Sequence, residues 1–249
     1  MTVAGIESVR LFSLEKLWHS YRVKKQNTKK LIIFDLDGTL YPLPGGSYDN
    51  SPLKKRVLKN AIKFISEKLS KNKVEAAAVL SAVQKKYGEQ ISIGLEKEYR
   101  LSRYDYFNVV WNIPARGIVK KNPNLRKVLL ELQKTYTLTL VSDAPQAWIK
   151  NVLTALSVED IFHRSVFSGE GNQRKGFGNV FSALIRKYKV RPADCVAVGD
   201  QEKTDIVPAK KLGMRTVFVH PSTRSLVADA NIKSIRELLS TLNFFPLRF

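Results

Sequence analysis

The stretch LIIFDLDGTL at residues 31–40 decides the fold of this protein. Its first residues form a short apolar run, which is typical of a β-strand buried on both faces of a parallel sheet. Gly38 and the following YPLPGG at residues 41–46 end the run, because glycine and proline interrupt regular structure. Asp35 and Asp37 stand where the strand ends. The stretch therefore predicts a buried strand that brings acidic side chains to one edge of a sheet.

Strand-like and helix-like segments alternate in the second half of the chain. Further strands are expected at residues 137–142, 165–168, 195–200 and 215–220, with segments of helical period between them and a last helix over residues 232–242. Strands that alternate with helices indicate βαβ units. The predicted fold class is therefore α/β, with a Rossmann-like parallel sheet.

Residues 52–113 follow a different pattern and contain no convincing strand. Apolar residues at helical spacing predict several helices, of which the first begins near Pro52 and the second ends at Gly88. We interpret this segment as an all-helical insertion after the first strand. The expected division is a core of residues 31–41 and 116–249 and an inserted helical domain of residues 42–115, which would be the cap of the family resemblance described below.

Length and composition limit the class of protein. A chain of 249 residues with 44% hydrophobic residues is expected to fold, and its single cysteine, Cys195, excludes an internal disulfide and favours a cytoplasmic location. No apolar run reaches the length of a membrane span. Residues 1–30 lack the apolar core of a secretory signal and are expected to form an amphipathic helical extension.

The formal net charge of +20 favours an anionic partner. Nucleic acid, anionic lipid and phosphorylated small molecules all meet this description. The basic residues are spread along the chain, whereas a nucleic-acid-binding protein typically gathers them in one stripe. The charge pattern therefore favours a small phosphorylated substrate over nucleic acid.

Polar residues gather where the predicted strands end. Asp35 and Asp37 follow the first strand, Ser142 ends the second, and Asp200 and Asp205 follow a later one. The carboxyl ends of parallel strands meet at one edge, where ligands of such sheets bind. Several carboxylates at one place suggest a divalent cation, and a set of oxygen ligands suits Mg²⁺ better than zinc. With a turn after the strand, one carboxylate of Asp35-x-Asp37 can attack a phosphorus atom while the other transfers a proton.

These segments resemble, in order, the four motifs of the haloacid dehalogenase-like hydrolase superfamily. DLDGTL at residues 35–40 resembles the first motif, Ser142 the second, Lys175 six residues before Phe181 the third, and VGDQEKTDI at residues 198–206 the fourth. One branch of the family carries a small helical cap at the place of the insertion. The segment that begins at WNIPARG also resembles pyrimidine 5′-nucleotidase-like members.

The resemblance implies a role for each acidic residue. Asp35 would be the nucleophile and a Mg²⁺ ligand. Asp37 would be the general acid and base, and it would bind the metal through its main-chain carbonyl group. Asp200 would bind Mg²⁺ directly, and Asp205 would support the metal or Lys175.

The resemblance also implies which residues contact the phosphate. Ser142 would donate a hydrogen bond to the transferring phosphoryl group, and Lys175 would neutralise its charge. Thr39 and Asp143 complete this expected set. Many relatives have asparagine at the position of Asp143. Its carboxylate is therefore expected either to cap the helix over residues 145–156, which is the interpretation we favour, or to offset the charge of nearby lysine and arginine side chains.

Hydrolysis of a phosphomonoester through an aspartyl-phosphate is the reaction that the sequence favours. A dehalogenase of this family would lack the second aspartate of the first motif, which is present here as Asp37. A sugar-phosphate mutase and a nucleic-acid-binding protein on a phosphatase fold are the alternatives. The expected substrate is a small phosphorylated metabolite, such as a nucleotide or a sugar phosphate, with Mg²⁺ as the cofactor.

Overall fold

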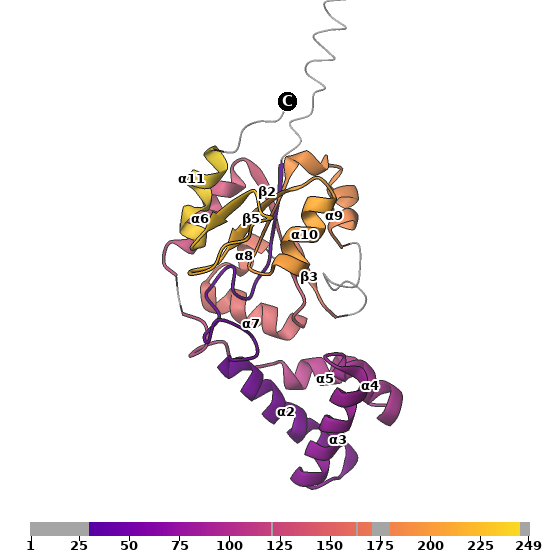
Figure 1. Cartoon of the computed structure of the whole chain (residues 1–249). Coiled ribbons are helices and arrows are strands. Elements are labelled where there is room, and N and C mark those ends of the chain that lie inside the picture. Colours follow the sequence, from indigo (N-terminus) through magenta and orange to yellow (C-terminus); the bar gives the residue numbers. More distant parts are fainter. Residues whose placement is uncertain (1–29, 121, 163, 171–179, 245–249) are drawn as a thin grey trace, which may run out of the picture.

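The computed structural model describes residues 30–120, 122–162, 164–170 and 180–244 (Figure 1). The predicted N-terminal helix of residues 1–30, apart from Lys30, lies outside the described residues. Lys175 also lies outside them. No helix among the described residues is both long enough and apolar enough to cross a membrane.

Six parallel strands form one sheet in the order β3-β2-β1-β4-β5-β6. The central strand β1 pairs on one side with β2 and on the other with β4, so that Ile32 lies opposite both Leu138 and Val196. This topology confirms the predicted α/β class with a Rossmann-like sheet. The strands are β1 (Lys30–Phe34), β2 (Tyr136–Ser142), β3 (Val166–Ser168), β4 (Cys195–Gly199), β5 (Arg215–Val219) and β6 (Ala230–Ile232).

Both faces of the sheet are covered by helices. Successive side chains of a strand point to opposite faces, so Ile32 and Phe34 join one apolar cluster while Leu31 and Ile33 join another. The first cluster takes in α6 (Leu125–Gln133), α7 (Gln146–Leu156), α8 (Glu159–Phe162) and α11 (Leu238–Asn243). The second takes in α9 (Val180–Tyr188) and α10 (Val207–Lys211). Short helical turns η1 (Pro192–Asp194), η2 (Glu202–Ile206) and η3 (Ile235–Glu237) complete the core.

The inserted segment forms a helical lobe of four helices (Figure 1). Local sequence fixes their ends. The Ser51 hydroxyl accepts a hydrogen bond from the first turn of one helix, and Asn72 and Glu75 form a capping box at the next. The helices are α2 (Pro52–Leu69), α3 (Lys73–Tyr87), α4 (Ile91–Tyr99) and α5 (Arg103–Val110).

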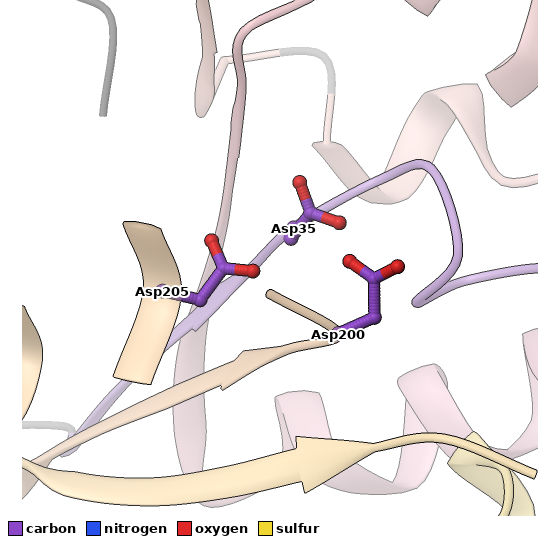
Figure 2. Close-up of side chains that lie close together, drawn as sticks. All are labelled: Asp35, Asp200 and Asp205. Carbon is purple, nitrogen blue, oxygen red and sulfur yellow. The ribbon is translucent and has the colours of Figure 1, made fainter. Parts of the chain in front are cut away.

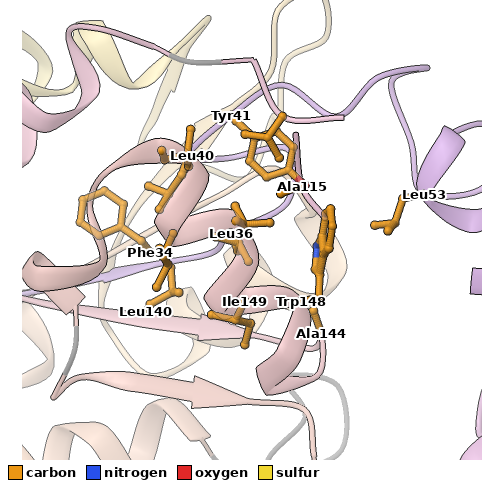
Figure 3. Close-up of a cluster of buried hydrophobic side chains, with 14 of the residues drawn as sticks. Phe34, Leu36, Leu40, Tyr41, Leu53, Ala115, Leu140, Ala144, Trp148 and Ile149 are labelled. Carbon is orange, nitrogen blue, oxygen red and sulfur yellow. The ribbon is translucent and has the colours of Figure 1, made fainter. Parts of the chain in front are cut away.

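Apolar packing and hydrogen bonds connect the helical lobe to the core. The apolar cluster of the α7 face continues into the lobe through Leu53 and Val57 (Figure 3). The Asn151 side chain, on α7, donates hydrogen bonds to the Ile113 carbonyl at 3.0 Å and to Asn112 Oδ1 at 3.1 Å. Helix α7 therefore holds the segment through which the chain returns from the lobe.

The prediction for residues 232–242 is wrong at its start. Ile232 is the last residue of strand β6, and the helical part begins only at η3 and continues as α11. Ala230 and Asn231 make up most of this strand, and both residue types are depleted in strands, so the sequence carries no strand signal here. Its pairing with Val217, Phe218 and Val219 of β5 decides its structure.

Candidate active site

The site lies at the carboxyl ends of β1 and β4. These neighbours lie at the point where the strand order reverses, because the chain goes from β1 toward β2 on one side and from β4 toward β5 on the other. Ligands of open α/β sheets bind at such a point. The backbone N–H of Asp35 donates to the Val198 carbonyl at 2.9 Å, so the pairing of the strands extends up to the site.

Three carboxylates converge there (Figure 2). Asp35 follows β1, Asp200 follows β4 and Asp205 lies in η2, and one oxygen of each lies within 4.8 Å of the others. Asp35 and Asp205 are only 5% and 2% exposed. Carboxylates held so close together in a buried place have the chemistry of a hard-cation site, since an oxygen set of this kind suits Mg²⁺.

Hydrogen bonds fix two of these carboxylates. The Thr39 hydroxyl donates to Asp35 Oδ2 at 2.9 Å, and the backbone N–H of Gln201 donates to Asp205 Oδ2 at 3.0 Å. Gly199 leaves the space that the Asp205 side chain fills, because a Cβ atom there would lie 2.3 Å from Asp205 Oδ2. Thr39, predicted to contact phosphate, is thus placed to orient the carboxylate of Asp35.

A tight turn after β1 brings Asp200 close to the first motif. Gly38 has a φ of +89°, in the region that side chains disfavour. A Cβ atom at this position would lie 2.0 Å from Asp200 Oδ2 and 2.6 Å from Asp200 Cγ. The glycine therefore both permits the turn and leaves room for the Asp200 carboxylate.

Asp37 lies two residues after Asp35 in the chain, but its side chain makes contacts of a different kind. Its Oδ1 atom accepts one hydrogen bond from the Tyr41 hydroxyl and a second from Trp148 Nε1, at 2.9 Å for the tryptophan. Burial, with a further contribution from the negative charge of Asp37, raises the pKa of Tyr41. The phenol therefore stays protonated and acts as a donor.

Ser142 is the last residue of β2, and Asp143 follows it at the same edge of the sheet. The Ser142 hydroxyl is buried and accepts the backbone N–H of Ala144 at 3.1 Å. The interpretation of Asp143 as a helix cap is wrong. Helix α7 begins after Pro145, whose own side chain makes no capping hydrogen bond. The first N–H group of the helix, that of Gln146, donates instead to Glu170 Oε1 at 2.8 Å.

Aromatic residues at the base of the helical lobe form a pair near the site. The rings of Tyr48 and Trp111 stack with centroids 5.9 Å apart and planes 13° apart. Burial above all, then the charges of Asp49, Glu89 and Asp37, raise the pKa of Tyr48. Since the Asp37 charge is among these causes, the pair lies within electrostatic reach of the site.

Comparison with known proteins identifies the family. The model of the haloacid dehalogenase-like hydrolases matches residues 29–213, which include every acidic residue described above. The chain belongs to the haloacid dehalogenase-like hydrolases. The resemblance that the four motifs indicated is thereby confirmed.

Curated proteins that this hydrolase resembles include phosphatases. A glyceraldehyde 3-phosphate phosphatase of Pyrococcus furiosus is 29% identical over 204 residues, which cover 76% of this chain and 80% of the relative. An N-acylneuraminate-9-phosphatase of Rattus norvegicus is 24% identical over 241 residues, which cover 86% and 93%. These relatives support the predicted assignment to the phosphatase branch of the haloacid dehalogenase-like hydrolases.

A solved structure shares the fold of this hydrolase. The crystal structure of a HAD phosphatase from Thermococcus onnurineus superimposes with a TM-score of 0.60 at 23% sequence identity. The match covers 86% of this chain and 97% of the other. It agrees with the predicted parallel sheet.

Sequence reasoning on this haloacid dehalogenase-like hydrolase missed three residues around the site. Asp37 accepts hydrogen bonds from Tyr41 and Trp148, and Glu170 accepts one from the start of α7. Trp148 lies 111 residues from Asp37 in the chain, so no local spacing relates the two. Tyr41 follows Asp37 by only four residues. This spacing indicates a contact only if the fold of the turn between them is already known.

Proposed function

We propose that this chain is a Mg²⁺-dependent phosphomonoesterase that acts on a small phosphorylated metabolite through an aspartyl-phosphate. The observation that carries the proposal is the convergence of Asp35, Asp200 and Asp205 at the switch point of the sheet in a haloacid dehalogenase-like hydrolase. Asp37, two residues from Asp35, supplies a further carboxylate for proton transfer.

The reaction takes two displacements. A carboxylate oxygen of Asp35 attacks the phosphorus, and the bond from phosphorus to the leaving oxygen breaks as Asp37 gives that oxygen a proton. In the second displacement water attacks the aspartyl-phosphate, gives its proton to Asp37 and releases inorganic phosphate. The Thr39 hydroxyl orients Asp35 for the first displacement.

Asp35, Asp200 and the main-chain carbonyl of Asp37 are the groups that would hold Mg²⁺, with Asp205 supporting them. When bound, the cation would neutralise negative charge on the phosphoryl group and the carboxylates. Ser142 stands at the same edge for contact with the phosphoryl group, and Lys175 retains the role that its motif implies.

The helical lobe is proposed to act as the cap, with residues 42–115 as its bounds. The acidic groups all lie in the core, so selection of the leaving group falls to side chains that approach from the lobe. The named relatives act on different phosphates, a triose phosphate and an acylneuraminate phosphate. At such identities the substrate class is a small phosphorylated metabolite such as a sugar phosphate or a nucleotide.

A reducing cytoplasmic location fits the one cysteine of the chain. Cys195 is buried and free, and burial raises the pKa of its thiol to about 12. A thiol of this kind stays protonated and inert.

The assay that tests the function measures phosphate release by the full chain from a panel of sugar phosphates, nucleotides and p-nitrophenyl phosphate. We expect turnover that requires Mg²⁺ and stops on addition of a chelator. Rapid acid quench with a labelled substrate should trap a phosphorylated protein. Turnover at the full rate in chelator would refute metal dependence. A panel without any turnover, combined with submicromolar binding of duplex DNA at physiological salt, would instead favour the nucleic-acid-binding alternative.

Trp111 provides a test of the proposed cap. Replacing Trp111 by alanine removes the partner of Tyr48 near Asp37, so the relative rates across the phosphate panel should change by about tenfold between substrates. The Mg²⁺ requirement should stay the same, because no acidic ligand is touched. Tyr104→Ala, which removes a 61% exposed ring of α5, is the matched control and should leave the relative rates unchanged. Identical relative rates for Trp111→Ala and wild type would exclude Trp111 as a determinant of selectivity.

A further inference from the structure

One carboxylate oxygen of Asp37, Oδ1, has two hydrogen-bond donors of its own. Oδ1 accepts hydrogen bonds from the Tyr41 hydroxyl and from Trp148 Nε1. Both donors belong to the buried core, since Tyr41 is 1% exposed and Trp148 is not exposed at all. The two donors come from different parts of the fold, the turn after β1 and the first turn of α7 (Figure 3).

Neither donor can easily turn away from Asp37. Trp148 Nε1–H is a donor only, and a buried indole N–H without an acceptor is costly. The phenol of Tyr41 is buried, and Asp37 Oδ1 is the acceptor of its hydroxyl. The backbone adds a constraint, because Asp37 and Tyr41 form a β-bridge across the turn. The side chain of Asp37 is therefore held in one orientation from two directions.

We propose that Tyr41 and Trp148 are positioning residues that engage Oδ1 of Asp37 and so make Oδ2 the oxygen that exchanges protons with the substrate. An oxygen that accepts two hydrogen bonds cannot also carry the transferable proton, so in the protonated carboxyl group that proton is on Oδ2. In the first displacement it passes from Oδ2 to the leaving oxygen. In the second, Oδ2 takes a proton from the attacking water. This inference rests on the proposed function.

The reactivity of the leaving group provides the test. A general acid accelerates the departure of a poor leaving group, such as an alkoxide, and matters little for p-nitrophenolate, which is stable without a proton. Misplacing Asp37 should therefore lower kcat/KM for an alkyl phosphate far more than kcat/KM for p-nitrophenyl phosphate. This ratio reports the steps up to departure of the leaving group and is independent of the later hydrolysis of the aspartyl-phosphate, which both substrates share. General loss of structure would lower both rates alike.

The main variant is Tyr41→Phe, which removes one hydroxyl and keeps the ring. We expect kcat/KM for an alkyl phosphate such as phosphoglycolate to fall about 10- to 100-fold, a part of what a general acid contributes, and kcat/KM for p-nitrophenyl phosphate to fall less than about threefold. Trp148→Phe removes the second donor and carries the same expectation. Tyr188→Phe is the matched control, because it removes a hydroxyl that donates to Ser165 Oγ away from the site, and both rates should stay at the wild-type level.

A double substitution links the effect to Asp37. Asp37→Asn should show the same dependence on the leaving group with a larger loss, and adding Tyr41→Phe to it should cost nothing further, since the two residues act as one unit. Equal losses on both substrates, no loss in either single variant, or full additivity with Asp37→Asn would overturn the inference while the proposed function stands. If the wild-type protein hydrolyses no member of the phosphate panel, the proposed function fails, and this inference fails with it.

Discussion

Asp35→Asn is expected to lower phosphomonoester turnover by at least about a thousandfold, because the amide has nearly the shape of the carboxylate but is a very poor nucleophile. The side-chain oxygen can still accept the hydrogen bond that Thr39 now gives to Asp35. The change therefore removes chemistry with little change in packing. The measurement is initial-rate hydrolysis of p-nitrophenyl phosphate at saturating Mg²⁺, with acid-quench trapping of phosphorylated protein.

The matched control for this substitution is Asp160→Asn. Asp160 is an exposed aspartate that pairs with Arg126 at 2.7 Å on the surface of the core. Surface ion pairs contribute about 0–1 kcal/mol, so this variant should fold and turn over substrate as the wild type does. Trapped phosphoprotein should be absent only for Asp35→Asn. A folded Asp35→Asn protein whose rate is within about tenfold of wild type would eliminate Asp35 as the nucleophile.

Gly38→Ala is expected to raise the Mg²⁺ concentration required for half-maximal activity by at least about tenfold, although it changes no charge. The new methyl group would stand 2.0 Å from Asp200 Oδ2, so the Asp200 carboxylate has to turn away from Asp35 and Asp205. Asp200 is one of the proposed ligands, and its displacement weakens the site. The measurement is a Mg²⁺ titration of phosphatase activity.

Gly117→Ala is the control that separates backbone strain from displacement of the ligand. Its φ of +88° is nearly the same as the +89° of Gly38, but a Cβ atom at Gly117 would meet nothing within 4 Å. Both variants pay the cost of a side chain in the left-handed region, about 1–2 kcal/mol. Only Gly38→Ala should need more Mg²⁺. Superimposable titrations of the two variants would show that Gly38 has no bearing on the metal ligands.

The strands and most helices were predictable from local sequence because each has a period or an end signal of its own. The run LIIF at residues 31–34 is apolar at every position because β1 is covered on both faces by the two clusters. Pro52 begins α2 and Gly88 follows α3, as their conformational preferences require. Strand β6 was missed because alanine and asparagine are depleted in strands, so pairing with β5 decides its structure.

The candidate site was predictable in part for a related reason. Parallel strands place their carboxyl ends at one edge, so a polar residue after each apolar run is directed toward the same place. Asp35, Asp200 and Asp205 come together as that rule predicts. The rule does not say which way a side chain turns after the strand, and the role assigned to Asp143 as a helix cap was wrong for this reason. Glu170, after β3, takes that place at the start of α7.

The sequence by itself determined the α/β class, the insertion of helices after the first strand and the three acidic residues that meet, because each depends on periods and strand ends within short segments. Only the tertiary structure decided that Thr39 holds Asp35 and that Tyr41 and Trp148 hold one oxygen of Asp37. It also decided that Gly38 makes room for Asp200. These contacts join residues as far apart in the chain as Gly38 and Asp200 and depend on distances below 3 Å. Such distances follow from how the turn after β1 packs against α7 and β4, which no pattern within one segment encodes.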